Sequence, residues 1–363
     1  MAGYCPAGTT GAQLLVISGR VPRVRSLCFR RSMMKIAVLG GGSWGTTLAD
    51  LLAKKGHEAR LWVREQAVMA EIRTTRENSW YLPGRKLSQR LDVSTDPAAV
   101  SEGARHFIFA VPSQFIRNAY QRFLKYLPKS PVIICASKGI ELDTLMTMSQ
   151  VCEDALASLK PRFAMLSGPS FAYEVIREMP TAVTLACKDK KAGKEVQEAL
   201  STPYFRVYTA SDVHGVELGG AIKNIIAIAA GVADGLGFGG NARAALITRG
   251  LHEMSRLGKA MGGERQTFMG LSGMGDLVLT CTGDLSRNRQ VGLRLAKGQK
   301  LLDILAEMKM VAEGVKTTEA VHTLREKAGI EMPITEQVYA ILYKDKDPSQ
   351  AVHDLMTRTL KDE

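Results

Sequence analysis

One lysine stands inside an otherwise apolar helical stretch of this chain. Residues 220–236 read G-A-I-K-N-I-I-A-I-A-A-G-V-A-D-G-L, so that Lys223 and Asn224 interrupt a hydrophobic run. Burial favours the neutral amine and lowers its pKa toward the range that a general base needs. The sequence therefore offers Lys223 as a proton acceptor, against the alternative of a lysine on a solvated helix face. Asp276, in L-S-G-M-G-D-L, is either the acidic group that orients this lysine or a helix cap.

Three further segments place polar groups where strands end or helices begin, which is where doubly wound folds bind ligands. A-S-K-G-I-E (136–141) offers Lys138, and L-S-G-P-S-F-A-Y-E-V (166–175) offers Gly168 and Ser170. D-L-S-R-N-R-Q (284–290) reads as a helix start with three exposed anion donors: Ser286, Arg287 and Asn288.

A glycine-rich stretch, A-V-L-G-G-G-S-W-G, occupies residues 37–45. Its glycines satisfy G-x-G-x-x-G directly after a strand and at the start of a helix, with a second strand at the distance expected of a βαβ unit. Gly40 then permits the tight turn, Gly42 lets a pyrophosphate approach the backbone, and Gly45 lets helix and strand pack closely. The helix N-terminus supplies free N–H groups to the phosphates, and Ser43 and Trp44 are expected against the dinucleotide.

The end of the second strand bears on the choice of nicotinamide cofactor. NAD sites usually carry Asp or Glu there, whereas this chain reads V-R-E, with Arg64 near the expected position and Glu65 next. An arginine suits the 2′-phosphate of NADP, so we expect the protein to use NADP(H). Use of NAD(H) as a second cofactor is left open. The alternative is a solvated surface arginine.

The elements that must position these groups form an α/β pattern followed by a helical one. Short apolar strands alternating with helices predict an N-terminal Rossmann-type, doubly wound, mostly parallel sheet with both faces covered. After about residue 212 the strand pattern stops, which predicts an all-helical C-terminal domain. We expect a dinucleotide-binding domain over 34–210 and a helical substrate-binding domain over 211–363. The expected strands are 35–39, 59–63, 106–111, 132–136, 163–167, 182–186 and 205–208; the expected later helices are 212–235, 241–261, 285–297, 301–309, 314–328 and 333–344.

Composition excludes several classes of protein. The net charge of +12 includes five arginines among residues 1–33, which hold no acidic residue, so +7 remains for the rest. That excess fits small anionic ligands better than nucleic acid, since basic runs interleaved with aromatic residues do not occur. Six scattered cysteines without C-x-x-C spacing argue against a zinc site or a disulfide framework and for a reducing compartment. No apolar stretch approaches the ~18–20 residues that a membrane span needs.

Residues 1–33 form a segment of their own. They are typical of a transit peptide, of a disordered extension, or of a start set upstream of the true one at Met33 or Met34. We prefer the last two, because the strand-like M-K-I-A-V-L begins at Met34.

Taken together, the motifs resemble those of bacterial-type NAD(P)-dependent glycerol-3-phosphate dehydrogenases. The resemblance runs in order from Met34 to about residue 350 and is most specific over 220–250. It is carried by these segments: G-G-G-S-W-G-T, F-A-V-P-S-Q, A-S-K-G-I-E, L-S-G-P-S-F-A, G-A-I-K-N-I-I-A, G-F-G-G-N-A-R-A-A-L-I-T-R-G, S-G-M-G-D-L, S-R-N-R and V-A-E-G-V.

This resemblance implies a role for each matching residue. Lys223 would be the proton acceptor and would contact substrate. Glycerol 3-phosphate would also be held by Lys138, Gly168, Ser170, Asp276, Ser286, Arg287 and Asn288. Cofactor contacts would come from Ser43, Trp44, Arg64, Lys138, Ala172, Arg287, Val311 and Glu313.

The implied activity is reversible hydride transfer between NAD(P)H and dihydroxyacetone phosphate, supplying glycerol 3-phosphate for phospholipid synthesis in the cytoplasm. A homodimer is one assembly that it allows. Two alternatives remain at this point: a 3-hydroxyacid or 6-phosphogluconate type dehydrogenase, which shares the architecture and a helical lysine, and a non-catalytic NADP(H)-sensing regulator.

Overall fold

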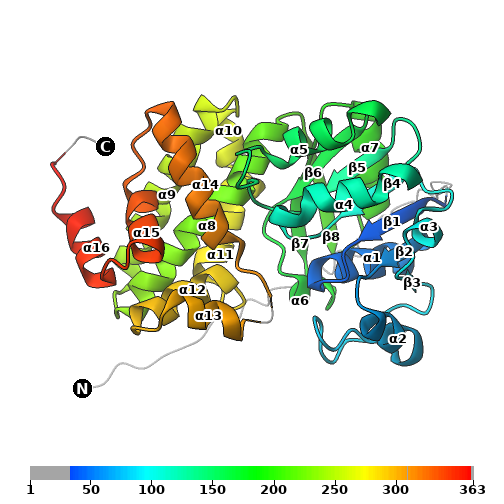
Figure 1. The fold of residues 1–363 in the computed structure, drawn as a ribbon, viewed down its shortest axis with the longest axis horizontal. Helices are drawn as coiled ribbons and strands as arrows, with labels where there is room; N and C mark the ends of the chain where they lie inside the picture. The colour runs from blue at the N-terminus through cyan, green and yellow to red at the C-terminus, as the bar shows by residue number, and fades with distance from the viewer. Residues whose placement is uncertain (1–32, 309, 361–363) are drawn as a thin grey trace, which may run out of the picture. The chain divides into compact units, whose positions relative to one another are not determined.

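The computed structural model describes residues 33–308 and 310–360, and within them it holds one eight-stranded sheet followed by helices (Figure 1). The expected extension over 1–33 lies, apart from Met33, outside the described residues. The described residues, 33–308 and 310–360, belong to one compact unit. The strands are β1 (Lys35–Leu39), β2 (Glu58–Trp62), β3 (Asp92–Ser94), β4 (His106–Phe109), β5 (Val132–Cys135), β6 (Arg162–Ser167), β7 (Thr181–Cys187) and β8 (Phe205–Ala210).

The sheet has the order β3-β2-β1-β4-β5-β6-β7-β8. Strands β1 to β6 pair in parallel, β7 runs antiparallel to β6, and β8 pairs in parallel with β7. The chain therefore moves outward in one direction from β1 to β3 and returns beside β1 with β4. The reversal lies at the carboxyl ends of β1 and β4, and open α/β sheets bind ligands in a crevice at such a point.

Helices cover both faces of the sheet, as the sequence predicts. One buried apolar cluster joins the sheet to α1 (Ser43–Lys55), α2 (Gln66–Thr75), α6 (Ala172–Val175) and α7 (Lys190–Leu200). A second cluster joins the other face to α3 (Pro97–Ser101), α4 (Ile116–Phe123), α5 (Met148–Ala155) and the first turn of α8 (Val213–Gly235). Three 3₁₀ turns complete this part: η1 (Ser113–Phe115), η2 (Leu124–Tyr126) and η3 (Ala157–Leu159).

A third apolar core surrounds the rest of α8. Helix α8 packs against the sheet at its start and against later helices along its length, which are drawn from yellow-green to red in Figure 1. The helices that follow α8 are α9 (Gly240–Ala260), α10 (Arg265–Phe268), α11 (Asp276–Thr282), α12 (Arg287–Ala296), α13 (Leu301–Glu307), α14 (Glu313–Ala328), α15 (Pro333–Tyr343) and α16 (Pro348–Met356), with a π-helical turn η4 (Leu271–Gly275) before α11. Of these, α9, α10, α11, α12, α14 and α15 pack against α8, whereas α13 packs against α12 and α16 against α12 and α15.

The fold class is confirmed, with three differences in detail. The sequence interpretation missed β3, because three residues are too few to show alternation, and it missed the short helices α10, α11 and α16 together with η4. It also shifted several strand ends by one or two residues: β2, β4 and β5 were ended late, and β7 and β8 were ended early. The exact domain limits of 34–210 and 211–363 stay predictions.

The expectation about apolar length was wrong for one helix. Among the described residues, α8 is long and apolar enough to cross a bilayer by length and composition. The most apolar 18 residues of α8 are 94% buried inside the protein, so this helix forms the centre of a core and does not expose an apolar surface.

Candidate active site

Helix α8 places Lys223 inside the helical core, and α11 supplies its partners. The Lys223 side chain is buried, and its Nζ donates to Asp276 Oδ1 at 2.6 Å and to Thr280 Oγ1 at 2.8 Å. Burial lowers the pKa of Lys223 to about 8; Asp276 opposes this shift and the nearby Lys138 adds to it. The solvated-face alternative for Lys223 is therefore wrong, and the amine has a proton affinity suited to acid–base chemistry near neutral pH.

Asp276 is shared between two lysines from different parts of the fold. Lys138, which follows β5, donates from Nζ to Asp276 Oδ2 at 2.7 Å and to the Gly168 carbonyl at 3.1 Å. Burial alone would raise the pKa of Asp276, but the two ammonium groups bring it below its ordinary value. The carboxylate therefore stays ionised and holds both lysines, which favours the orienting role over the capping role.

Local backbone features explain how Asp276 reaches this position. The π-helical turn η4 precedes it, and such turns often occur at functional sites. A Cβ atom at Gly219 of α8 would lie 2.8 Å from the Ser272 carbonyl oxygen, so the glycine lets η4 approach α8 closely. A Cβ at Gly220 would lie 2.8 Å from Ser167 Oγ and 3.5 Å from Lys138 Cγ, so this neighbouring glycine makes room for the lysine.

The loop after β6 joins the same cluster. Gly168 has φ +135°, a backbone conformation that favours glycine. Its carbonyl accepts hydrogen bonds from Lys138 Nζ and from Ser170 Oγ, the latter at 3.0 Å. The structure thus brings together five of the residues selected from the sequence: Lys138, Gly168, Ser170, Lys223 and Asp276.

The start of α12 differs from its expected exposure. Ser286 is buried and caps the helix, with its Oγ accepting from the Arg289 N–H at 3.3 Å. Asn288 is also buried, between α8 and the start of α14. Its side-chain amide donates to Asn224 Oδ1 and accepts from the Gly314 N–H, both at 2.9 Å. Of the three proposed anion donors, only Arg287 is exposed, and its Nη1 donates to the Val311 carbonyl at 2.8 Å.

The segment around 310–313 connects the helical part to the crevice of the sheet. Glu313 accepts from the Ser113 N–H at 3.0 Å and from Ser113 Oγ at 2.5 Å, and Ser113 follows β4. Burial raises the pKa of Glu313, against the effect of these hydrogen bonds and of Arg287. Ser43 Oγ lies 3.9 Å from Met310 Sδ, so this segment also meets the glycine turn.

The glycine turn itself has the geometry that the sequence predicts. Gly40 has φ +124°, and a Cβ there would lie 2.6 Å from the Ala110 carbonyl oxygen. A Cβ at Gly45 would lie 2.0 Å from the Gly40 carbonyl oxygen. Gly42 differs: its φ is −68°, and no heavy atom of the described residues lies within 4 Å of its Cβ position. Because no contact with the described residues requires a glycine there, the open space fits a bound pyrophosphate.

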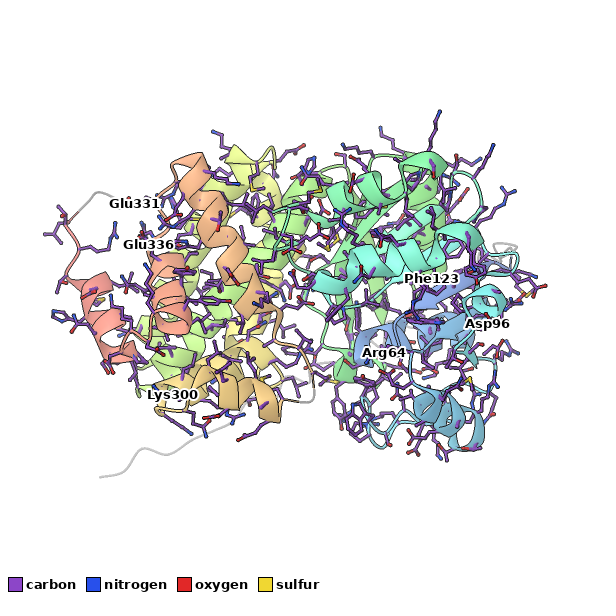
Figure 2. The ribbon with its side chains drawn as sticks, in the orientation of Figure 1. Arg64, Asp96, Phe123, Lys300, Glu331 and Glu336 are labelled. Atoms are coloured by element: carbon purple, nitrogen blue, oxygen red, sulfur yellow. The ribbon has the colours of Figure 1, made fainter. Side chains whose placement is uncertain are left out.

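The remaining candidates lie around this turn. Trp44 is half-buried, with its ring 6.4 Å from that of Phe205, and the Ala172 carbonyl accepts from Thr47 Oγ1 at 3.4 Å. Arg64, labelled in Figure 2, follows β2; its side chain is 76% exposed and pairs with Glu65 at 2.6 Å. Arg64 is therefore at the surface and available to an anion.

Two residues of the site were missed from the sequence. Thr280 lies one helical turn after Asp276, so its spacing could have shown that it shares the face of α11 toward Lys223. Ser113, inside F-A-V-P-S-Q, could not be paired with Glu313 from the sequence, because Glu313 lies 200 residues further along the chain. Among residues 33–308 and 310–360, no cluster of His, Cys, Asp and Glu could hold a metal ion.

Fold and site together define a nucleotide-binding, doubly wound domain joined to a helical domain that carries a buried basic residue. The family of the NAD-dependent glycerol-3-phosphate dehydrogenase N-terminus matches residues 35–193, and that of the C-terminus matches residues 212–353. The chain belongs to the NAD-dependent glycerol-3-phosphate dehydrogenase family, which confirms the resemblance.

Individual relatives agree with this assignment. The chain is 87% identical over 330 residues to the glycerol-3-phosphate dehydrogenase [NAD(P)+] of Solidesulfovibrio magneticus, covering 91% of this chain and 100% of the relative. It is 64% identical, with the same coverage, to the enzyme of that name from Maridesulfovibrio salexigens. The crystal structure of glycerol-3-phosphate dehydrogenase from Coxiella burnetii superimposes with a TM-score of 0.86 at 42% identity, over 90% of this chain and 99% of that one.

Proposed function

We propose that this chain is an oxidoreductase that interconverts dihydroxyacetone phosphate and sn-glycerol 3-phosphate with NAD(P)(H). The observation that carries the proposal is the buried Lys223 amine, paired with Asp276 beside Lys138, in a chain of this family. Family membership also decides against the 3-hydroxyacid or 6-phosphogluconate alternative and against a regulator without activity.

The proton chemistry is assigned to Lys223. The nicotinamide, when bound, supplies or takes up the hydride at C2 of the substrate. In the reducing direction, negative charge grows on the carbonyl oxygen, and the Lys223 ammonium donates a proton to it. In the oxidising direction, the neutral amine removes the proton of the C2 hydroxyl. Asp276 and Thr280 fix the direction of Nζ, and a pKa of about 8 leaves both protonation states accessible.

The substrate is held by groups around this amine. Arg287 and the N-terminus of the ten-residue helix α12 suit the phosphate, because charge-assisted hydrogen bonds and a helix N-terminus both favour anions. Buried Ser286 and Asn288 shape this end of the helix, and Asn288 has a second amide N–H to donate. Lys138, Gly168, Ser170 and Asp276 complete the proposed substrate set.

The dinucleotide is assigned to the crevice between β1 and β4. Its pyrophosphate lies over Gly42, against the N-terminus of α1, and Gly40 and Gly45 maintain the turn. Further contacts are proposed from residues that border the crevice or its rim: Ser43, Trp44, Arg64, Lys138, Ala172, Arg287, Val311 and Glu313.

Exposed Arg64 supports a preference for NADP(H). Replacing Arg64 with Ala should lower kcat/KM for NADPH by about 10–100-fold, the range of a charge-assisted hydrogen bond, and leave that for NADH nearly unchanged. Steady-state kinetics with both cofactors measures this. A strong NADH preference in the parent enzyme would show that Arg64 does not read the phosphate.

The central experiment follows NADPH oxidation with dihydroxyacetone phosphate. Replacing Lys223 with Ala should lower kcat by about 10²–10⁴-fold, the range of general acid–base catalysis, with dinucleotide affinity little changed. A near-normal kcat in that variant would remove Lys223 from the chemistry. Turnover of a 3-hydroxy acid in place of the triose phosphate would contradict the substrate assignment.

The wider role is proposed on the family's account. It is supply of glycerol 3-phosphate for phospholipid synthesis in the cytoplasm, by a homodimer that binds small molecules, does not bind nucleic acid and has no transmembrane segment. Light scattering of the purified protein measures the assembly, and a monomeric mass would contradict the dimer.

A further inference from the structure

The segment between α2 and β3 reaches the glycine turn through one buried asparagine. Asn78 has 0% of its surface exposed. Its Nδ2 donates to the Gly41 carbonyl and to Thr46 Oγ1, both at 2.9 Å. Thr46 Oγ1 in turn donates to the Gly41 carbonyl at 3.2 Å. Two side-chain donors therefore converge on one carbonyl of the turn.

Asn78 is itself fixed by a turn that does not involve the glycines. Its own carbonyl accepts from the N–H groups of Tyr81 at 3.2 Å and of Leu82 at 2.7 Å. The Gly41 residue is confined on another side as well, because a Cβ there would lie 2.5 Å from Val63 Cγ1. The position of the Gly41 carbonyl is thus set by its surroundings rather than by the glycines.

Peptide geometry transmits this constraint to Gly42. The Gly41 carbonyl and the Gly42 N–H belong to one planar trans peptide, in which the two groups point in opposite directions. With the carbonyl directed at Asn78, the Gly42 N–H points away from Asn78. That N–H is among the donors that helix geometry leaves without an intrahelical partner at the start of α1, and the space at Gly42 is open.

We propose that Asn78 is a positioning residue for the dinucleotide: by holding the Gly41–Gly42 peptide, it aims the Gly42 N–H at the pyrophosphate. This inference rests on the proposed function, since it assigns a residue to the dinucleotide site of that enzyme. It predicts that loss of the amide weakens binding of the phosphates and leaves binding of the adenosine part and the chemical step unchanged.

The test uses two probes that differ in their phosphates, ADP and adenosine, measured by calorimetry. Asn78→Leu removes the donors without adding charge. We expect its Kd for ADP to rise about tenfold, with its Kd for adenosine and its kcat at saturating NADPH within about threefold of the parent. The control is Thr335→Val, which removes an equally buried hydroxyl that donates to Glu253 at 3.0 Å in the helical part; its ADP affinity should not change.

The outcomes separate a positioning role from a structural one. Parent-like ADP affinity in Asn78→Leu, or equal loss for ADP and adenosine, would overturn the proposal. If that variant does not fold, Thr46→Val is measured instead. Its Kd for ADP should rise about threefold while its Kd for adenosine does not change, and an unchanged Kd for ADP would overturn the proposal. If Asn78→Leu loses affinity for ADP alone while the parent does not reduce dihydroxyacetone phosphate, the positioning role of Asn78 is supported and only the proposed substrate is contradicted.

Discussion

The protonation of Lys223 depends on two neighbours of opposite charge. Burial away from water lowers its pKa to about 8, Asp276 raises it and Lys138 lowers it. Since oxidation of glycerol 3-phosphate needs the neutral amine, its kcat should rise with pH to a plateau with a midpoint near 8. The reverse reaction needs the ammonium, so its kcat should fall above about pH 8. Initial rates in both directions across pH 6–10 measure the two profiles.

The control for this pH profile is the loss of the carboxylate. Because Asp276 raises the pKa of Lys223, Asp276→Asn should move the midpoint of the oxidation profile below 8, whatever its effect on the plateau. A midpoint that stays in place or moves upward would show that another group titrates.

Gly42 separates ligand binding from folding at the scale of one residue. Its φ of −68° suits alanine, and its Cβ position is open among the described residues, so Gly42→Ala should keep or slightly raise the free energy of unfolding. The methyl group would keep the pyrophosphate from the backbone, and we expect the dinucleotide Kd to rise about tenfold or more. Gly45→Ala, with its Cβ 2.0 Å from the Gly40 carbonyl oxygen, should destabilise the fold instead. Calorimetry and thermal melting test both, and parent-like affinity in Gly42→Ala would contradict the assignment.

At the scale of elements, α8 and α12 meet backbone to backbone. A Cβ at Gly292 of α12 would lie 2.0 Å from the Ile228 carbonyl oxygen, and one at Gly231 of α8 would lie 2.0 Å from the Arg289 carbonyl oxygen. Gly292→Ala should therefore lower the free energy of unfolding by about 1–3 kcal/mol, the cost of overpacking, and displace the start of α12 with its phosphate-binding groups. Denaturant titration measures the first effect, and the KM for dihydroxyacetone phosphate measures the second.

The control for this helix contact is Gly240, the first residue of α9. No heavy atom of the described residues lies within 4 Å of its Cβ position, and its φ is not in the left-handed region. Gly240→Ala should leave stability and KM near the parent values. Equal stability of Gly240→Ala and Gly292→Ala would show that the close contact is relieved at no cost.

The elements show how far the sequence alone reaches. Long periodic helices and apolar strands were predicted within a few residues, because their patterns are local. Short elements were missed, since the three residues of β3 and the five of η4 are too few to show a period. The same division holds for the site: Lys223 stands out as a charge in an apolar helix, and its partner Asp276 was a candidate. The predicted exposure of Ser286 and Asn288 was wrong. A polar helix start is usually exposed to solvent, and the sequence does not show that Asn224 and Gly314 pack against Asn288 in the fold.

At the scale of the whole molecule, α8 belongs to two cores at once. Val213 and Val216 pack into the core beneath the sheet, and the helix from Leu218 onward lies in the helical core. Buried Glu217, near this junction, accepts from the N–H and Oγ of Ser149 on α5 at 2.5 and 2.7 Å. Unfolding either part would expose one side of this helix and break these contacts, so the two parts should unfold together.

This coupling can be measured because the two parts carry different probes. The three tryptophans, Trp44, Trp62 and Trp80, all precede residue 210, whereas the α-helical far-UV signal comes largely from the later helices. Thermal melts followed by tryptophan fluorescence and by circular dichroism at 222 nm should therefore coincide in the ligand-free enzyme, as a single cooperative transition requires. Fluorescence and circular dichroism midpoints that differ by several degrees would show two independently stable parts, and α8 would then belong energetically to only one of them.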